Sequence, residues 1–121
     1  PGNYSVSATG EARGDAWDDE GIYALMSCQH ATRMGAFAGN NAADELLDVP
    51  TRPYHQKTYV TCLDLGDAGA LFTRGWERKV ELVGDVAKKT KQEINTVWIY
   101  PPKAERAAAL ASADPERVTD L

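Results

Sequence analysis

Hydrophobic and polar residues recur with two different periods along this chain, and the periods separate expected helices from expected strands. From about Ser27 to Leu47, apolar residues return every three or four positions, which is typical of a helix with one apolar stripe. Ser27 is the expected N-cap, and Pro50 and Pro53 break the chain afterwards. The predicted stripe comprises Ala31, Met34, Ala38, Ala42 and Leu46.

Shorter segments rich in β-branched and aromatic residues predict strands. Residues 57–64, 70–74 and 79–83 have this composition, and glycine-containing turns separate them. They predict a small antiparallel meander. A further short strand is expected at residues 4–9, before an acidic loop at residues 14–21.

Two further helices are expected toward the C-terminus. Residues 85–98 fit a helix with Val86, Ile94 and Val97 directed inward, and residues 103–113 form an alanine-rich segment. Lysines occupy the expected outer face of the first of these helices: Lys88, Lys89 and Lys91. The predicted fold class is therefore α+β, with a short strand, a long helix, a three-stranded antiparallel meander and two C-terminal helices.

Composition limits the classes of partner. The 121 residues predict a single domain spanning residues 1–121, and the net charge of −5 argues against nucleic acid as a partner. No run approaches the roughly 18 apolar residues of a membrane span, so no integral membrane segment is expected. Cys28 and Cys62 lack C-x-x-C spacing and are expected to be reduced thiols in a cytoplasmic protein.

The segment Val6–Ala12 resembles a late strand and turn of FAD-dependent pyridine nucleotide oxidoreductases, in which hydrophobic residues precede Ala-x-Gly-Asp-Ala. Glu11 stands where that pattern has Asp, and Gly14-Asp15-Ala16 offers a second triplet without a leading strand. Further segments extend the match in the expected order: Met26–Ala31, Tyr59–Gly66, Gly75–Trp76 and Ile94–Pro102. The chain thus resembles the C-terminal part of bacterial oxidoreductases similar to type II NADH dehydrogenases.

This resemblance implies one wall of a flavin site. It places the Glu11 carboxylate near a ribityl hydroxyl and a helix start on the pyrimidine side of the ring. The implied cofactor-binding residues are Gly10, Glu11, Cys28, Gln29, His30 and Ala31. No G-x-G-x-x-G motif occurs, so we expect the FAD pyrophosphate-binding and NADH domains to be lacking. FAD is then expected only with a complementing chain, and otherwise no cofactor.

Without those domains, apolar surface on the first strand and the long helix would be exposed to water. A homodimer or a complementing protein chain is therefore expected to cover it. The candidate catalytic residues are Glu11 and His30, because a carboxylate and an imidazole can exchange protons near neutral pH. Successive helical residues point about 100° apart, so Cys28 and His30 are not expected to form a nucleophilic pair. No spacing pattern brings His30 and His55 together with carboxylates, and no metal site is expected.

Three functions remain open. The first is hydride transfer from NAD(P)H to flavin and on to an acceptor, by an enzyme of which this chain is a part. The second is a stand-alone, cofactor-free isomerase, dehydratase or cyclase, for example in natural-product biosynthesis. It would use Glu11 and His30 on a small-molecule substrate in the vacated flavin pocket. The third is a non-catalytic binding or assembly module.

Overall fold

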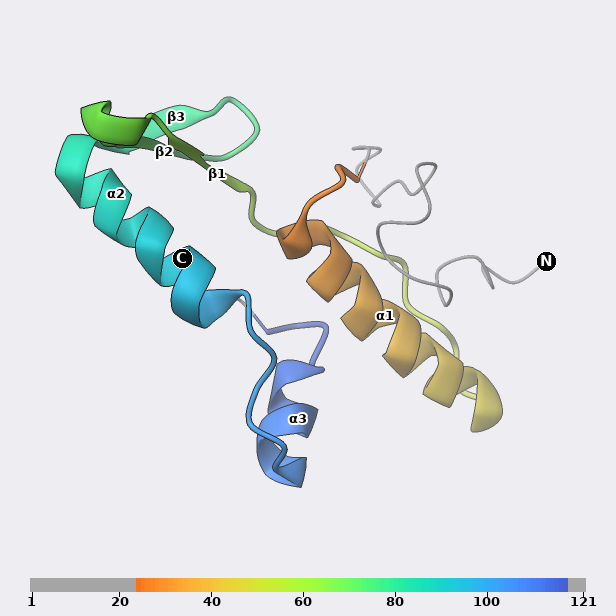
Figure 1. Ribbon diagram of the computed structural model, residues 1–121. Coiled ribbons are helices and arrows are strands. Elements are labelled where there is room, and N and C mark those ends of the chain that lie inside the picture. The colour runs from red at the N-terminus through yellow and green to blue at the C-terminus, as the bar shows by residue number, and fades with distance from the viewer. Residues whose placement is uncertain (1–23, 118–121) are drawn as a thin grey trace. The chain divides into compact units, whose positions relative to one another are not determined.

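The computed structural model of the protein describes residues 24–117 (Figure 1). These residues form two compact units, each with its own core. The first unit contains residues 24–56 and 102–117, and the second contains Lys57–Pro101. The strand expected at residues 4–9, the acidic loop, Gly10 and Glu11 lie outside the described residues. The expectation of a single domain stays a prediction.

The second unit is built on a three-stranded antiparallel sheet, as predicted. Its strands are β1 (Val60–Asp64), β2 (Ala70–Arg74) and β3 (Lys79–Val83), in the order β1-β2-β3. The β1–β2 register places Thr61 opposite Thr73, whose hydroxyl oxygens lie 2.5 Å apart. Together with the helices, this sheet confirms the α+β class.

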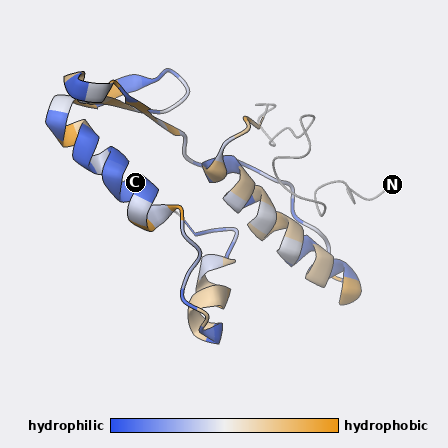
Figure 2. Cartoon of the chain, in the orientation of Figure 1, coloured by the Kyte–Doolittle hydropathy of each residue, from blue (hydrophilic) through white to orange (hydrophobic). Residues whose placement is uncertain are grey.

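Helix α2 (Gly84–Glu93) packs on this sheet through Ala87, which is fully buried. The core beneath it combines the buried side chains of Val60, Ala70 and Phe72 with Ala87, and Cys62 and Leu82 pack against it. Figure 2 shows hydrophilic residues along most of α2 and apolar residues along parts of the strands. A methyl side chain at the contact lets the helix backbone approach the sheet closely.

The inward face predicted for residues 85–98 is partly wrong. Val86 and Val97 are 59% and 62% exposed, whereas Ile94 is partly buried. Val86 precedes Ala87 by one residue, about 100° around the helix, and so points away from the sheet. After α2 the chain continues as a π-helix, Ile94–Trp98. Because a π-helix has more residues per turn than an α-helix, the side chains that follow point in other directions than an α-helical period predicts.

Two glycines let the backbone meet where the sheet joins α2. Gly69 has φ +92°, and a Cβ placed there would lie 2.6 Å from both the carbonyl carbon and Cα of Gly84. An isolated bridge also pairs Ala70 with Gly84. This backbone contact fixes where α2 begins and therefore which of its side chains faces the sheet.

The first unit is organised around α1 (Cys28–Leu46), which confirms the long helix and its N-cap at Ser27. Its core is formed by Ala24, Met34, Phe37 and Tyr54. Phe37 is 1% exposed and meets the Tyr54 ring edge-on, with centroids 5.5 Å apart.

The predicted apolar stripe of α1 is correct only at Met34 and Ala38, which are buried. Ala42 is exposed, and Leu46 is 88% exposed. Phe37 joins the buried face because Tyr54 packs against its ring, and the buried residues of the helix all lie from His30 to Ala38, nearer its start than its end.

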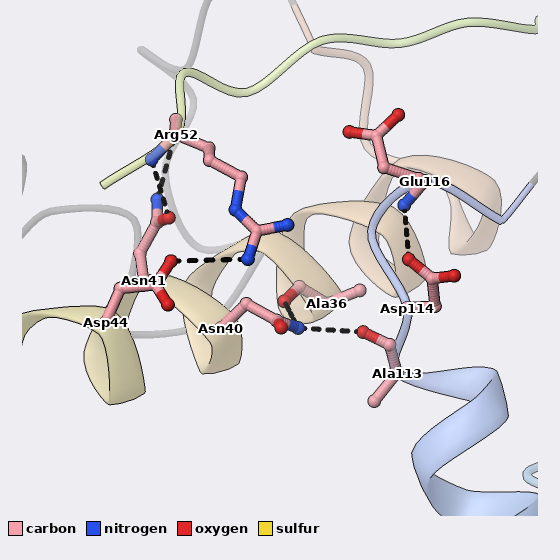
Figure 3. A network of polar contacts seen from close by, with 8 residues as sticks. All are labelled: Ala36, Asn40, Asn41, Asp44, Arg52, Ala113, Asp114 and Glu116. Carbon is pink, nitrogen blue, oxygen red and sulfur yellow. Dashed lines mark hydrogen bonds and ion pairs between the residues drawn. The ribbon is translucent and has the colours of Figure 1, made fainter. Parts of the chain in front are cut away.

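Side-chain amides tie other segments of the first unit to α1 (Figure 3). Asn40 Nδ2 donates to the carbonyl of Ala113, which follows α3 (Arg106–Ser112), at 2.9 Å. Asn41 makes two hydrogen bonds with the backbone of Arg52, donating at 2.8 Å and accepting at 2.9 Å. Amides suit such links because each carries both donors and an acceptor.

Candidate functional site

The start of α1 brings together four of the predicted site residues. Ser27 has an extended backbone, φ −152° and ψ 155°, and the helix begins at the next residue. The first helical hydrogen bond runs from Ala31 N to Ser27 O at 3.0 Å. Cys28 is exposed, while Gln29 and Ala31 are partly buried. The other two predicted cofactor-binding residues, Gly10 and Glu11, lie outside the part of the chain that the structure describes.

His30 is directed into the first unit and is only 1% exposed. The Oγ of Ser27 lies 2.7 Å from its Nδ1. Ser27 makes no side-chain hydrogen bond to the backbone N–H groups of the helix start, since its hydroxyl is engaged by the imidazole ring. Cys28 is exposed and His30 enclosed, so the two side chains do not form a nucleophile–base pair.

Arg33 lies one helical turn beyond Gln29 and was not among the residues predicted for the site. Its Nε donates to the carbonyl of His55 at 2.9 Å, and its Nη1 donates to the carbonyl of Arg117 at 3.0 Å. The guanidinium carbon lies 5.5 Å from the centroid of the Phe37 ring. One feature of the sequence could have indicated Arg33 as a site residue. It is an arginine in the first half of a helix rich in small residues, and it lies on the same face as Gln29.

A tyrosine and a histidine after α1 complete the surroundings of Arg33. Tyr54 is buried, and its hydroxyl donates to Gln56 Oε1 at 2.6 Å. The His55 ring is partly buried and meets the Phe37 ring edge-on, with centroids 5.2 Å apart. The segment that carries Tyr54 and His55 therefore holds the Arg33 side chain against the helix.

The second unit has a hollow along its β2–β3 hairpin. Its lining residues are Arg74, Gly75, Trp76, Glu77, Lys79 and Glu81. Arg74 Nε lies 3.0 Å from both carboxylate oxygens of Glu81, so the charge of this arginine is compensated. Trp76 stacks on Tyr59 with ring centroids 4.3 Å apart, which occupies one face of the indole.

Two titratable groups of the second unit are shifted by their surroundings. Burial raises the pKa of the Cys62 thiol above its usual range. The pKa of Asp64 is lowered, mainly because Lys88 Nζ donates to its carboxylate at 2.6 Å and also because Gly66 N donates at 2.8 Å. The raised pKa of Cys62 reflects its packing in the core, and the lowered pKa of Asp64 reflects its ion pair with Lys88. Among residues 24–117, no group of three His, Cys, Asp or Glu side chains is arranged to hold a metal ion.

Comparison with known proteins adds a specific similarity. The chain is 50% identical over 112 residues to an NADH dehydrogenase-like protein in each of two Mycobacterium tuberculosis strains. The match covers 92% of this chain and 28% of each relative, so the chain spans less than a third of their length. No family model matches the chain. No solved structure matches it. Within the described range, no helix is both long enough and apolar enough to cross a membrane.

Proposed function

We propose that this chain is the C-terminal part of an NADH dehydrogenase-like flavin oxidoreductase and contributes one wall of its FAD site. The observation that carries the proposal is the 50% identity over 92% of the chain to relatives described as NADH dehydrogenase-like. The reaction proposed for the whole enzyme is hydride transfer from NAD(P)H to the flavin and onward to an acceptor.

In this proposal, the start of α1 faces the pyrimidine edge of the flavin ring. A helix N-terminus favours negative charge because its first N–H groups point out of the helix. The first turn contains no acidic side chain that would oppose such a partner, and the Ser27 hydroxyl does not cap it. FAD, when bound, supplies the redox chemistry, and Cys28–Ala31 bind and orient its ring.

The other proposed residues act at different points of the site. Glu11 accepts a hydrogen bond from a ribityl hydroxyl. His30 fixes the Ser27 side chain through the 2.7 Å contact and so positions the helix start. Its proposed role as an acid or base requires a substrate that reaches an enclosed ring, since His30 is 1% exposed. The pyrophosphate of FAD is bound by residues beyond this sequence, because no G-x-G-x-x-G motif occurs in it.

A protein interface is part of the proposal. Apolar side chains are exposed around the end of the π-helix: Val97, Trp98, Ile99 and Tyr100, the last of them 64% exposed. Neighbouring apolar side chains of this size favour association over hydration. We assign this segment to a homodimer contact or to a contact with a complementing chain, which the native mass of the purified protein tests.

The central experiment is a visible absorption spectrum of this chain purified together with the complementing part of the enzyme, followed by addition of NADH under anaerobic conditions. We expect the spectrum of oxidised flavin and its bleaching by NADH. Gln29→Ala should weaken FAD binding about tenfold, because the variant lacks one group that would form a hydrogen bond with the flavin ring. The matched control is Gln92→Ala, an exposed glutamine of α2, which should leave FAD binding unchanged. A colourless complete enzyme that FAD neither binds nor stabilises would contradict the proposal, whereas the chain without its complementing part is expected to be colourless.

A further inference from the structure

In the part of the chain that the structure describes, neutral groups hold the guanidinium group of Arg33. Its hydrogen bonds go to the carbonyl oxygens of His55 and Arg117, and its cationic carbon lies over the Phe37 ring. Within the described residues, no carboxylate forms an ion pair with it. Its Nη2 atom is buried and has no hydrogen-bond acceptor there. Among residues 24–117, this partly buried guanidinium group thus has no compensating negative charge.

The other arginines with resolved polar contacts show the contrast. Arg52 pairs with Asp44 at 3.4 Å, and Arg74 pairs with Glu81 at 3.0 Å. Both side chains are more than 40% exposed, and each still has a carboxylate partner. Removing a charged group from water is costly unless an opposite charge or several hydrogen bonds replace the solvent. Within residues 24–117, Arg33 therefore has a buried guanidinium nitrogen but lacks the carboxylate partner that Arg52 and Arg74 have.

We propose that Arg33 binds an oxyanion, the phosphate or carboxylate group of a ligand, on the face of α1 that it shares with Gln29. The approach is from the side of Nη1, whose hydrogen bond to the Arg117 carbonyl lies at the surface. An oxyanion replaces that neutral carbonyl and also accepts from Nη2, which gives two parallel charge-assisted hydrogen bonds. Such bidentate pairs are roughly twice as strong as bonds to neutral acceptors.

The surroundings of Arg33 preorganise it for this role. The Nε bond to the His55 carbonyl, at 2.9 Å, fixes the rotation of the planar group. The fully buried Phe37 supports it from one side. A guanidinium held in this way loses little conformational entropy on binding. The contacts that define this site are those of Arg33 with His55, Arg117 and Phe37, and none of them is used in the flavin assignment.

The test titrates the full protein with pyrophosphate and, separately, with succinate, at constant ionic strength, by calorimetry and by thermal unfolding. We expect saturable binding of at least one of the two, and the preferred one tells whether the natural group is a phosphate or a carboxylate. Arg33→Gln should weaken it about tenfold or more, since a hydrogen bond to a charged group contributes roughly 1.5–3 kcal/mol. Arg33→Lys, which keeps the charge but not the fork, should bind with intermediate affinity.

Arg52→Gln is the matched control, an arginine of the same unit whose carboxylate partner is already present. It should change the binding constant by less than about twofold. Circular dichroism establishes whether each variant is folded. If Arg33→Gln does not fold, the comparison of Arg33→Lys with the wild-type protein still tests the proposal. Absence of saturable binding to the wild-type protein, or equal binding by wild type and the folded Arg33 variants, overturns the proposal.

Discussion

The two units of this chain are held together in different ways. In the second unit, Lys57–Pro101, three strands share a continuous antiparallel ladder, and α2 covers a core centred on Phe72 and Ala87. In the first unit, one long helix carries the core, and the described segments around it contain one further helix, α3, and no strand. These segments are attached by separate hydrogen bonds from α1 side chains to their backbone, as at Asn40, Asn41 and Arg33, and by the packing of Tyr54 on Phe37.

This difference predicts how each unit responds to a change. A ladder distributes stability over many backbone bonds that form together, so the loss of one surface contact matters little. A helix that holds irregular segments by separate links depends on each link and on the few buried rings. We therefore expect the first unit to lose its peripheral segments one at a time, and the second to lose its structure as a whole.

Removing the central aromatic ring of each core should have the largest effect. Phe37→Ala and Phe72→Ala each delete a ring that is at most 2% exposed, and such deletions cost about 3–5 kcal/mol. Hydrogen exchange should show faster exchange in α1 for the first variant and in β1–β3 for the second. Leu46→Ala is the control, since that side chain is 88% exposed and its loss should change stability by less than about 0.5 kcal/mol.

The two phenylalanine variants also test the comparison itself. If the units have independent cores, the amides of the unmutated unit keep their protection in each variant. Equal loss of protection in α1 and in β1–β3 for both variants would show that the cores are one cooperative structure, and the contrast between the units would be wrong.

The next largest effect is expected at the backbone contact of the second unit. Gly69→Ala places a Cβ 2.6 Å from backbone atoms of Gly84, in a conformation with φ +92° that L-residues rarely adopt. We expect a loss of about 2 kcal/mol or more in the free energy of unfolding. Gly75→Ala is the matched control, because its φ is +74° but no atom lies within 4 Å of the added carbon. It should cost only the conformational strain, about 1 kcal/mol.

Chemical denaturation of both glycine variants measures this difference. A similar loss for Gly69→Ala and Gly75→Ala would mean that the close approach of the Gly69 and Gly84 backbones does not determine how α2 meets the sheet. The rotation of α2 would then need another explanation.

The elements that could be predicted from the sequence are those determined by local patterns. The strands at residues 70–74 and 79–83 were predicted at their observed bounds, because alternation and turn glycines act over a few residues. The inward positions of α2 could not be predicted. They depend on the approach of Gly69 to Gly84 and on the π-helix, and neither leaves a periodic signal.

The candidate site shows the same limit. The helix start at Cys28–Ala31 was predictable because Ser27 and the apolar period mark it locally. The surroundings of Arg33 were not, since its two carbonyl partners lie 22 and 84 positions away in the chain. A backbone carbonyl is present at every residue, so the sequence gives no indication of which one an arginine reaches.

A smaller effect is expected from cutting one link of the first unit. Asn40→Ala removes the hydrogen bond to the Ala113 carbonyl and should cost about 1 kcal/mol. Exchange should accelerate mainly in α3, the helix that Ala113 follows. Asn95→Ala, at an exposed position of the π-helix, is the control and should leave α3 unchanged. Unchanged exchange in α3 of the Asn40 variant would show that the links do not hold the segments separately.

The smallest effect is expected at the surface ion pair of the second unit, where the ladder should make a single contact nearly dispensable. The pKa of Asp64 is lowered mainly by the hydrogen bond from Lys88, so this pair contributes stability above the usual carboxyl pKa and loses it as pH falls through the lowered value. Lys88→Gln should return the pKa toward its usual range while the unfolding midpoint at neutral pH hardly moves, because Asp64 is exposed. Carboxyl NMR titration measures the shift, with Lys89→Gln as the control at an exposed neighbouring lysine. At neutral pH, the unfolding midpoint of Lys88→Gln could instead fall as far as that of Gly69→Ala. That result would mean that the second unit, like the first, depends on individual side-chain contacts.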